Sequence, residues 1–166
     1  MNAGAYGGEL KELIKSVKLL SPEGHQFTFS NSDMCFGYRT SILSSNDYIA
    51  LSAVLKLKKG DERQIRQTMK ELNARRAEKQ PLEYPSAGST FKRPEGSFAG
   101  TLIEQCGLKG YTIGGAQVSE KHAGFVINKG DATSKDIYDV IYHVKNTVYA
   151  KTGIMLVPEV KMIGDF

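Results

Sequence analysis

The spacing of the hydrophobic residues changes once along the chain, near Gly60, and this change restricts the folds that the chain can adopt. Before Gly60, apolar residues alternate with polar ones or are β-branched, a pattern that is typical of strands. After it, residues 61–80 carry apolar side chains at helical spacing, which predicts a helix. We therefore predict two units, a strand-rich one at residues 1–59 and a second at residues 60–166 that opens with this helix.

The second unit mixes both kinds of element. We expect helices at residues 99–107 and 133–153 and strands at residues 111–119, 124–130 and 154–164. Thr133 and Asp136 form a variant of the capping box at the start of the longer helix, and Gly153 marks its end. The first unit adds three expected strands, at residues 16–21, 26–30 and 48–59. Strands and helices interspersed in this way predict the α+β class.

The composition is that of a soluble protein and gives no sign of a membrane or secreted protein. The chain has 166 residues, of which 24% are charged and 40% hydrophobic, as in ordinary soluble proteins. No apolar stretch approaches the roughly 20 residues of a membrane helix, and no secretory signal is visible after Met1. We therefore expect a cytoplasmic protein with no membrane contact. Cys35 and Cys106 are isolated, so we predict two buried free thiols and no metal site.

The net charge of +4 suits a protein that handles an anionic small molecule, and it would also suit weak nucleic-acid binding. The basic run "NARRAEK" at residues 73–79 lies within the predicted helix and contains no aromatic residue. Nothing in the sequence resembles an RNA- or DNA-binding signature. We interpret the run as a solvated helix face and expect no nucleic-acid partner.

Two loops have unusual compositions. "NAGAYGGE" at residues 2–9 is rich in glycine, which lets backbone N–H groups approach a ligand, although a flexible leader would look the same. It contains neither a GxGxxG fingerprint nor a P-loop lysine. "YPSAGSTFKRPEG" at residues 84–96 sets Ser89 on a tight turn and follows it with an aromatic residue and two cations. Taken alone, such a serine most often bonds to its own backbone.

Five segments occur in the same order as in a known family of enzymes. They are "NAGAYGGE", "FGYRTS", "AGSTFKRPEGSFAGTLIEQCGLKG", "GGAQVSEKHAGFVIN" and "PEVKMIG". In these segments the chain resembles the UDP-N-acetylenolpyruvoylglucosamine reductases, flavoenzymes that make UDP-N-acetylmuramate for bacterial peptidoglycan. The resemblance covers nearly the whole chain, and the short stretches after Arg39 and Arg93 are similar to the branch without long substrate-covering insertions. It implies the end of an FAD-binding α+β domain at residues 1–59, then an α+β substrate-binding domain at residues 60–166 whose last strand returns to the active site.

Members of this family have a long segment before "NAGAYGGE" that contains much of the FAD-binding region, and this sequence begins after it. The resemblance therefore implies an incomplete FAD-binding domain whose partner is the missing N-terminal FAD-binding segment. A truncated gene, an expressed fragment and one half of a split enzyme all stay open. A non-catalytic UDP-sugar-binding fragment and a basic module that binds an acidic polymer stay open as well.

The resemblance also implies a reaction. NADPH reduces FAD, the flavin passes hydride to C3 of the enolpyruvyl group of UDP-N-acetylenolpyruvoylglucosamine, and negative charge spreads from C2 into the carboxylate. Such a reaction needs an acid that protonates C2 and cations that hold the charge. Ser89 matches the family's proton donor, and Arg39, which we expect at the start of a strand, matches the arginine at the enolate. Glu159 matches a second acidic group near the intermediate, although its alternation with Lys161 would equally suit an outward strand position.

The remaining matches are contacts to the cofactor and the substrate. The resemblance implies FAD contacts at Asn2, Gly4, Ala5, Tyr6 and Gly7. It implies substrate contacts at Tyr38, Lys79, Lys92, Arg93 and His122. Arg93 stands where some relatives have asparagine, which would give a charge-assisted bond to phosphate.

Overall fold

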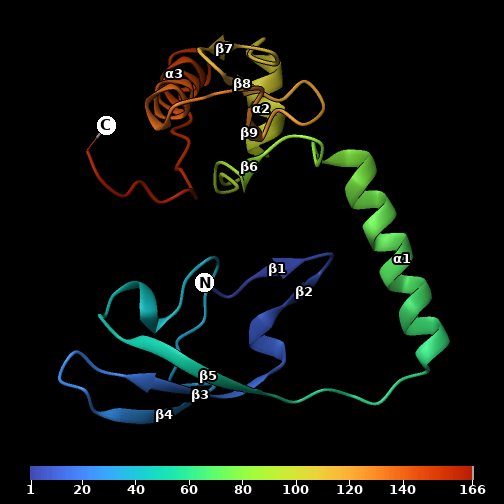
Figure 1. The fold of residues 1–166 in the computed structure, drawn as a ribbon, viewed down its shortest axis with the longest axis vertical. Helices are drawn as coiled ribbons and strands as arrows, with labels where there is room; N and C mark the ends of the chain where they lie inside the picture. Colours follow the sequence, from blue (N-terminus) through green and yellow to red (C-terminus); the bar gives the residue numbers. More distant parts are fainter. Residues whose placement is uncertain (166) are drawn as a thin grey trace. The chain divides into compact units, whose positions relative to one another are not determined.

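The computed structural model describes residues 1–165 and separates the chain into two compact units, Met1–Glu62 and Arg63–Phe166. Strands occur in both units, and the long helices belong to the later part of the chain (Figure 1). This mixture confirms the predicted α+β class. The roles that we assign to residues 1–59 and 60–166 stay predictions.

The first unit is built on a three-stranded antiparallel sheet of order β4–β3–β5. Its strands are β3 (Ile14–Leu20), β4 (Gln26–Ser30) and β5 (Ile49–Leu55), close to the three predicted ones. Strand β5 ends before residues 56–59, three of which are lysines. A short hairpin of β1 (Gly4–Ala5) and β2 (Gly8–Glu9) opens the chain, and 3₁₀ turns lie at η1 (Leu10–Glu12) and η2 (Ile42–Ser44).

The core of the first unit is small because one strand supplies most of it. Val17 and Leu19 lie two residues apart on β3, so their side chains point to the same face of the sheet, where both are buried. Ile14 and Met34 complete the buried cluster, and Phe29, which pairs with Val17 from β4, packs against it. Every residue of β5, in contrast, is exposed.

The second unit contains a four-stranded antiparallel sheet of order β6–β9–β8–β7. Its strands are β6 (Ser86–Ser89), β7 (Thr112–Ile113), β8 (Ala116–Val118) and β9 (Phe125–Asn128). Its helices are α2 (Ala99–Gln105) and α3 (Ser134–Thr152), and α1 (Glu62–Lys79) precedes the sheet. Helix α3 contacts three of the four strands, so its apolar stripe forms the centre of this core.

Helix α3 begins and ends as its sequence predicts. The Thr133 hydroxyl accepts a hydrogen bond from the Asp136 N–H at 3.1 Å, and the Asp136 carboxylate accepts one from the Thr133 N–H at 2.9 Å. These bonds lower the pKa of Asp136, the backbone N–H of Thr133 contributing most. Gly153 ends the helix with a φ of 73°, the left-handed conformation that glycine adopts most easily.

Three predictions about local structure are wrong. Residues 111–119 form two strands rather than one, because the chain reverses at Gly114, which has a φ of 53°. Residues 154–164 do not form a strand but make one isolated bridge, from Pro158 to Phe91; proline has no N–H with which to continue a ladder. Cys35 is exposed in a turn, whereas Cys106 is buried as expected.

Helix α1 is solvated along its length. None of its residues is buried, including Ile65 and Met69 of the apolar stripe and the basic run at residues 73–79. Within residues 1–165, no helix combines the length and the apolar character that crossing a membrane requires.

Amide hydrogen exchange is expected to be slower in the second unit than in the first. The buried apolar cluster of the second unit contains fifteen of the described residues, and that of the first contains four. Local opening costs less where fewer apolar contacts are lost. Exchange followed by mass spectrometry should show the strongest protection in β8, β9 and α3. Equal protection in β3 and β5 would contradict this expectation.

Candidate functional site

Arg39 lies in a tight turn and not at the start of a strand, so that prediction is wrong. The Gly37 N–H donates to the Thr40 carbonyl at 3.2 Å, and the Thr40 N–H donates to the Gly37 carbonyl at 3.3 Å. Between them Arg39 has a φ of 53°, which is unusual for a residue with a side chain. Its guanidinium lies over the exposed Tyr38 ring, 5.2 Å from the centroid.

The opening glycine-rich loop is a β-hairpin. Tyr6 and Gly7 connect β1 to β2 with φ angles of 51° and 86°, and two consecutive positive values define the mirror-image turn that suits tight hairpins. A Cβ added to Gly7 would meet no atom within 4 Å, and Tyr6 is 60% exposed. The tip of the hairpin is therefore open to a ligand.

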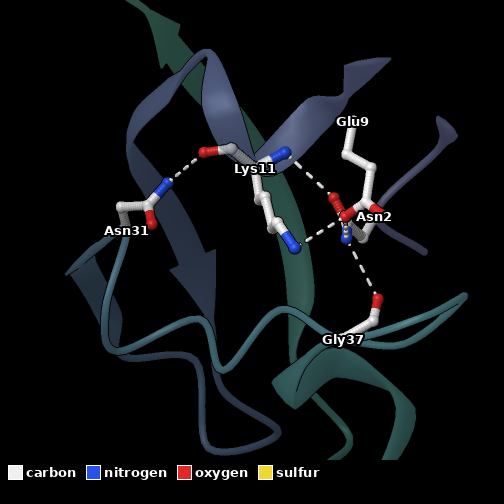
Figure 2. A network of polar contacts seen from close by, with 5 residues as sticks. All are labelled: Asn2, Glu9, Lys11, Asn31 and Gly37. Carbon is white, nitrogen blue, oxygen red and sulfur yellow. Dashed lines mark hydrogen bonds and ion pairs between the residues drawn. The ribbon is translucent and has the colours of Figure 1, made fainter. Parts of the chain in front are cut away.

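Asn2 joins this hairpin to the turn that carries Arg39. Figure 2 shows its side chain between Glu9, Lys11 and Gly37. The Asn2 amide donates to the Glu9 carboxylate at 2.8 Å and to the Gly37 carbonyl at 3.0 Å, and its oxygen accepts from the Lys11 N–H at 2.9 Å. Asn2 is only 2% exposed, so these bonds use the side chain within the unit. The predicted FAD contact of Asn2 would fall to its backbone.

A second hydrogen bond links the opening hairpin to the turn of Arg39, and here the turn supplies the donor. The Arg39 guanidinium donates to the Gly4 carbonyl at 3.4 Å. Nearby, the Lys11 ammonium lies 2.9 Å from the Glu9 carboxylate, and this hydrogen bond, followed by the one from Asn2, lowers the pKa of Glu9. The opening hairpin and the turn that carries Arg39 thus form one hydrogen-bonded group in the first unit.

In the second unit, Ser89 ends strand β6 and does not lie on a free turn. It pairs with Phe125 of β9, and Gly88 before it has a φ of 84°, which only glycine adopts readily. The Ser89 side chain is exposed, and its hydroxyl donates to the Phe91 carbonyl over 3.4 Å. That bond is long, so the hydroxyl can turn towards a ligand at small cost.

The residues after Ser89 are held on both sides. The Thr90 N–H donates to the Gly124 carbonyl at 2.8 Å, on the side of β9. On the other side, the Glu159 N–H donates to the Thr90 carbonyl and the Lys92 N–H donates to the Val157 carbonyl, both at 2.8 Å. This places Glu159 on the chain segment directly beside the one that follows Ser89.

The two cations after Ser89 differ in their surroundings. Lys92 is partly buried through its pairing with the C-terminal segment. Arg93 turns back over its own loop: its guanidinium lies 4.1 Å from the Phe98 ring centroid, and its Nε donates to the Ser97 carbonyl at 3.4 Å. Arg93 is therefore held against an exposed aromatic ring rather than extended into solvent.

His122 is held by packing as well as by a hydrogen bond. Its Nδ1 accepts from the Gly124 N–H at 3.1 Å, so the neutral ring carries its proton on Nε2. The ring packs edge-on against Phe125, with centroids 5.0 Å apart. A Cβ on Gly124 would lie 2.9 Å from the ring, so the ring can approach this closely only because residue 124 is glycine.

Lys79 and His122 lie on segments that Lys121 connects. Lys79 is the exposed last residue of α1. The Lys121 ammonium donates to the Ala77 carbonyl in the last turn of α1 at 2.8 Å and lies 3.6 Å from the Glu83 carboxylate. The sequence offers no signal for this contact, because the partners are far apart along the chain.

A cavity of about 330 Å³ lies between β6, β9, α3 and the C-terminal segment. It is lined by Pro85, Ser86, Ala87, Thr90, Val126, Asn128, Ile137, Ile141 and Val160. Neither Ser89 nor Glu159 is among the residues that line it, although their neighbours Thr90 and Val160 are. Among residues 1–165, no three His, Cys, Asp or Glu side chains are grouped so that they could hold a metal ion.

Comparison with known proteins assigns the family. A family model described as "UDP-N-acetylenolpyruvoylglucosamine reductase, C-terminal domain" matches residues 80–163, about half of the chain. The chain belongs to this reductase family. The match contains Ser89, Lys92, Arg93, His122 and Glu159, the predicted site residues of the second unit other than Lys79.

Individual members of the reductase family match nearly the whole chain. The UDP-N-acetylenolpyruvoylglucosamine reductase of Clostridioides difficile is 59% identical over 99% of this chain and 54% of the relative. That of Caldanaerobacter subterraneus is 52% identical over 99% of this chain and 55% of the relative. The crystal structure of the Thermus caldophilus reductase superposes with a TM-score of 0.80 at 32% identity, over 94% of this chain and 56% of that one. The chain thus spans about half the length of the relatives it matches.

The structure brings together some of the residues predicted from the resemblance to this family. Arg39 and Tyr38 lie beside the opening hairpin, and Ser89 and Glu159 lie on neighbouring segments. Arg39 and Tyr38 belong to the first unit, and Ser89 and Glu159 belong to the second. Sequence reasoning missed Thr90, which is buried and bonded on both sides.

Replacing Asn2 by alanine is expected to loosen the turn that carries Arg39. The substitution removes the bond to the Gly37 carbonyl and leaves buried groups unpaired, so the first unit should lose about 1–3 kcal/mol. Asn31→Ala is the matched control, because Asn31 also donates two bonds at 2.7 Å each. One goes to the Lys11 carbonyl (Figure 2) and the other to the Ile14 carbonyl. Amide exchange at Thr40 should accelerate in Asn2→Ala and not in Asn31→Ala. Equal acceleration in both variants would show that Asn2 has no special role in this turn.

Proposed function

We propose that this chain is the part of a UDP-N-acetylenolpyruvoylglucosamine reductase that binds the substrate and protonates it. The proposal rests on the pairing of residues 90–92 with residues 157–159, which sets Glu159 beside the segment that carries Ser89 in a chain that belongs to this family. The product would be UDP-N-acetylmuramate, a precursor of peptidoglycan.

Each candidate residue has a chemical task in this proposal. Ser89 is an exposed hydroxyl at the end of a strand held on both sides, so it can deliver a proton to C2 of the substrate from a fixed position. Arg39 stays charged, and its planar guanidinium can bind the carboxylate into which the charge spreads. Glu159 is the second acidic group. Lys92 and Arg93 would attract the phosphates, and Tyr38, Lys79 and His122 would make further substrate contacts.

We infer that the opening hairpin contacts one edge of a flavin nucleotide. Its tip is open around Gly7, the exposed Tyr6 ring lies beside it, and Arg39 approaches Gly4 from the neighbouring turn. Asn2, Gly4, Ala5, Tyr6 and Gly7 would hold that edge mainly through their backbone. FAD, reduced by NADPH, would supply the hydride.

Two other functions of the chain make different predictions. A non-catalytic UDP-sugar-binding fragment would bind a UDP-sugar, but a polypeptide completed with the missing part would not reduce the enolpyruvyl substrate. One half of a split enzyme would be colourless and inactive until its other half is added as a separate polypeptide. A basic module for an acidic polymer would be retained on heparin, released by moderate salt, and would not bind a UDP-sugar. The family match favours the reductase over the polymer-binding module. The cytoplasmic location stays a prediction.

Ser89→Ala tests the proton donor. In a polypeptide completed with the part of the C. difficile relative that the chain does not match, flavin reduction by NADPH should be nearly unchanged, since that step needs no proton at C2. Reoxidation by the enolpyruvyl substrate should slow by about 10² to 10⁴, the usual contribution of a positioned general acid. Stopped-flow flavin absorbance separates the two steps. Ser86→Ala, on the same strand, should change neither.

The opposite pattern for Ser89→Ala, with flavin reduction slowed and reoxidation by substrate spared, would exclude Ser89 as the proton donor. A loss of both steps together with loss of the native circular dichroism spectrum would indicate misfolding. Ser89→Thr then serves as the second variant, because it retains a hydroxyl and should recover part of the reoxidation rate if the hydroxyl is the donor.

The chain by itself is expected to bind FAD weakly or not at all. It spans about half the length of its relatives, and its proposed FAD contacts are confined to residues 2–7. The absorbance spectrum of the purified chain measures bound flavin directly, and the completed polypeptide serves as the positive control. Stoichiometric FAD on the purified 166-residue chain would contradict this expectation.

A further inference from the structure

The cavity between β6, β9, α3 and the C-terminal segment has no task in the proposed reaction. Its volume is about 330 Å³, and all its lining residues belong to the second unit. We call it the β6–α3 cavity. Protein interiors contain few voids larger than a water molecule, and binding sites for small molecules begin at roughly 300 Å³. The β6–α3 cavity is therefore large enough to bind a small molecule.

An irregularity of strand β6 lies at this cavity. Ser86 pairs with Ile127 of β9. Ser89, three residues later, pairs with Phe125, which is only two residues from Ile127. One residue of β6 is therefore left over, and a bulge of this kind bends the strand and interrupts the ladder. Ser86 and Ala87, where the irregularity begins, line the cavity. The cavity thus adjoins the same bulge that precedes Ser89.

The lining of the cavity determines the charge of its ligand. None of the nine lining residues carries a charge. A charged ligand would lose its hydration there without gaining a counter-charge, which is unfavourable. This excludes the UDP-sugar, NADPH and FAD, all of which carry phosphates. Six lining residues are apolar, and the three polar ones are Ser86, Thr90 and Asn128. The cavity therefore suits a neutral, mainly apolar molecule.

Two of the polar residues retain hydrogen-bond donors that the protein does not use. Thr90 is only 2% exposed, and its hydroxyl oxygen accepts from the Val126 N–H at 3.0 Å. The Asn128 side-chain oxygen accepts from the Gly130 N–H at 2.9 Å and from the Ala132 N–H at 3.2 Å. Among residues 1–165, no group accepts the Thr90 hydroxyl proton or the Asn128 amide protons. Both donors suit an acceptor such as a carbonyl oxygen.

We propose that the β6–α3 cavity binds a small neutral molecule that has an apolar body and one carbonyl group. The carbonyl oxygen accepts hydrogen bonds from the Thr90 hydroxyl and the Asn128 amide. The apolar body packs against Ile137, Ile141 and Val160. A cavity of about 150 Å³ holds one benzene molecule, so about 330 Å³ admits roughly a dozen non-hydrogen atoms. Aryl ketones meet this description.

A molecule in the cavity also stabilises the pairing of residues 90–92 with residues 157–159. Thr90 and Val160 line the cavity, and the Glu159 N–H, next to Val160, donates to the Thr90 carbonyl at 2.8 Å. Separation of the two segments would open the cavity, so the ligand binds only the paired state. At ten times its Kd, such a ligand slows exchange through this opening about tenfold. The proposal does not depend on the proposed function, because neither binding nor exchange requires turnover.

The probe is acetophenone, and cumene is its matched reference, because a methyl group replaces the carbonyl oxygen. Each is titrated into the 166-residue chain and into the completed polypeptide, without substrate or NADPH. NMR signals of Val126 and Ile141 should shift with both probes in both proteins. At ten times its Kd, acetophenone should slow amide exchange at Lys92 and Glu159 about tenfold. Exchange in strand β3 of the first unit should not change.

Asn128→Asp tests the hydrogen bonds to the carbonyl. Aspartate keeps the oxygen that accepts from the Gly130 and Ala132 N–H groups but has no amide donor. Acetophenone should therefore bind at least about tenfold more weakly, and cumene should change by less than about twofold. Asn146→Asp, at an exposed position of α3, is the control and should bind both probes like the unaltered chain.

Ala87→Leu is the second variant, because it tests the cavity without changing a hydrogen bond. Ala87 is exposed at the rim of the cavity, so a larger side chain there narrows the entrance without overpacking the core. Binding of both probes should weaken by at least about tenfold, since the apolar body of each must pass this rim. Ala150→Leu, at an exposed position of α3, is the control and should bind both probes normally. Circular dichroism checks the fold of each variant.

Three outcomes would overturn the proposal. The first is that neither probe shifts the signals of Val126 and Ile141, because the cavity would then admit no ligand. The second is that acetophenone binds equally well to the unaltered chain and to Asn128→Asp, which would show apolar contact without a carbonyl site. The third is that binding to the chain disappears in the completed polypeptide. That result would show that the rest of the reductase fills the cavity.

Discussion

The position of the candidate proton donor depends on the hydrogen bonds of one buried residue, Thr90. Its N–H donates to the Gly124 carbonyl, its hydroxyl accepts from the Val126 N–H at 3.0 Å, and its carbonyl accepts from the Glu159 N–H. Thr90 thus joins the strand that ends at Ser89 to β9 and to the C-terminal segment at once. Because a buried group without its partner costs about 1–3 kcal/mol, this residue holds three segments in register.

In the first unit, Asn2 has the role that Thr90 has in the second: it holds neighbouring segments in register. There too a buried polar side chain bonds an irregular segment to a regular one, in this case the turn of Arg39 to the opening hairpin. In both units the groups proposed to touch the substrate are exposed or partly exposed, whereas the groups that position them are buried. The buried residues therefore keep the backbone rigid, and the exposed ones are accessible to a ligand. This division suits a site whose geometry must be fixed before the ligand binds.

Elements whose signals are local could be predicted from the sequence. Helix α3 has its capping box, its stripe of valines and isoleucines and its terminal glycine within or directly beside its own residues, so the sequence predicts its bounds closely. The segment around Pro158 depends on Phe91, which is distant along the chain, and alternation alone wrongly predicted a strand there. The family resemblance proposes roles for Ser89 and Glu159, and the structure adds that backbone bonds through Thr90 place these residues on neighbouring segments.

Three residues near the opening hairpin have an unusual backbone conformation. Asn2, Tyr6 and Arg39 have positive φ angles of 25°, 51° and 53°, and all three belong to the hydrogen-bonded group in the first unit. Such a conformation costs a non-glycine residue of the order of 1 kcal/mol, and glycine would avoid most of this cost. Tyrosine and arginine at these positions therefore lower the stability of the first unit. A role for their side chains would explain why glycine does not replace them. Asparagine tolerates the region better, and its side chain is used internally. Cys35 and Asp131 carry the same cost, with φ angles of 46° and 56°, but Tyr6 and Arg39 belong to the hydrogen-bonded group. The ligand-binding role proposed for Tyr6 and Arg39 gives a reason to retain their side chains at these positions.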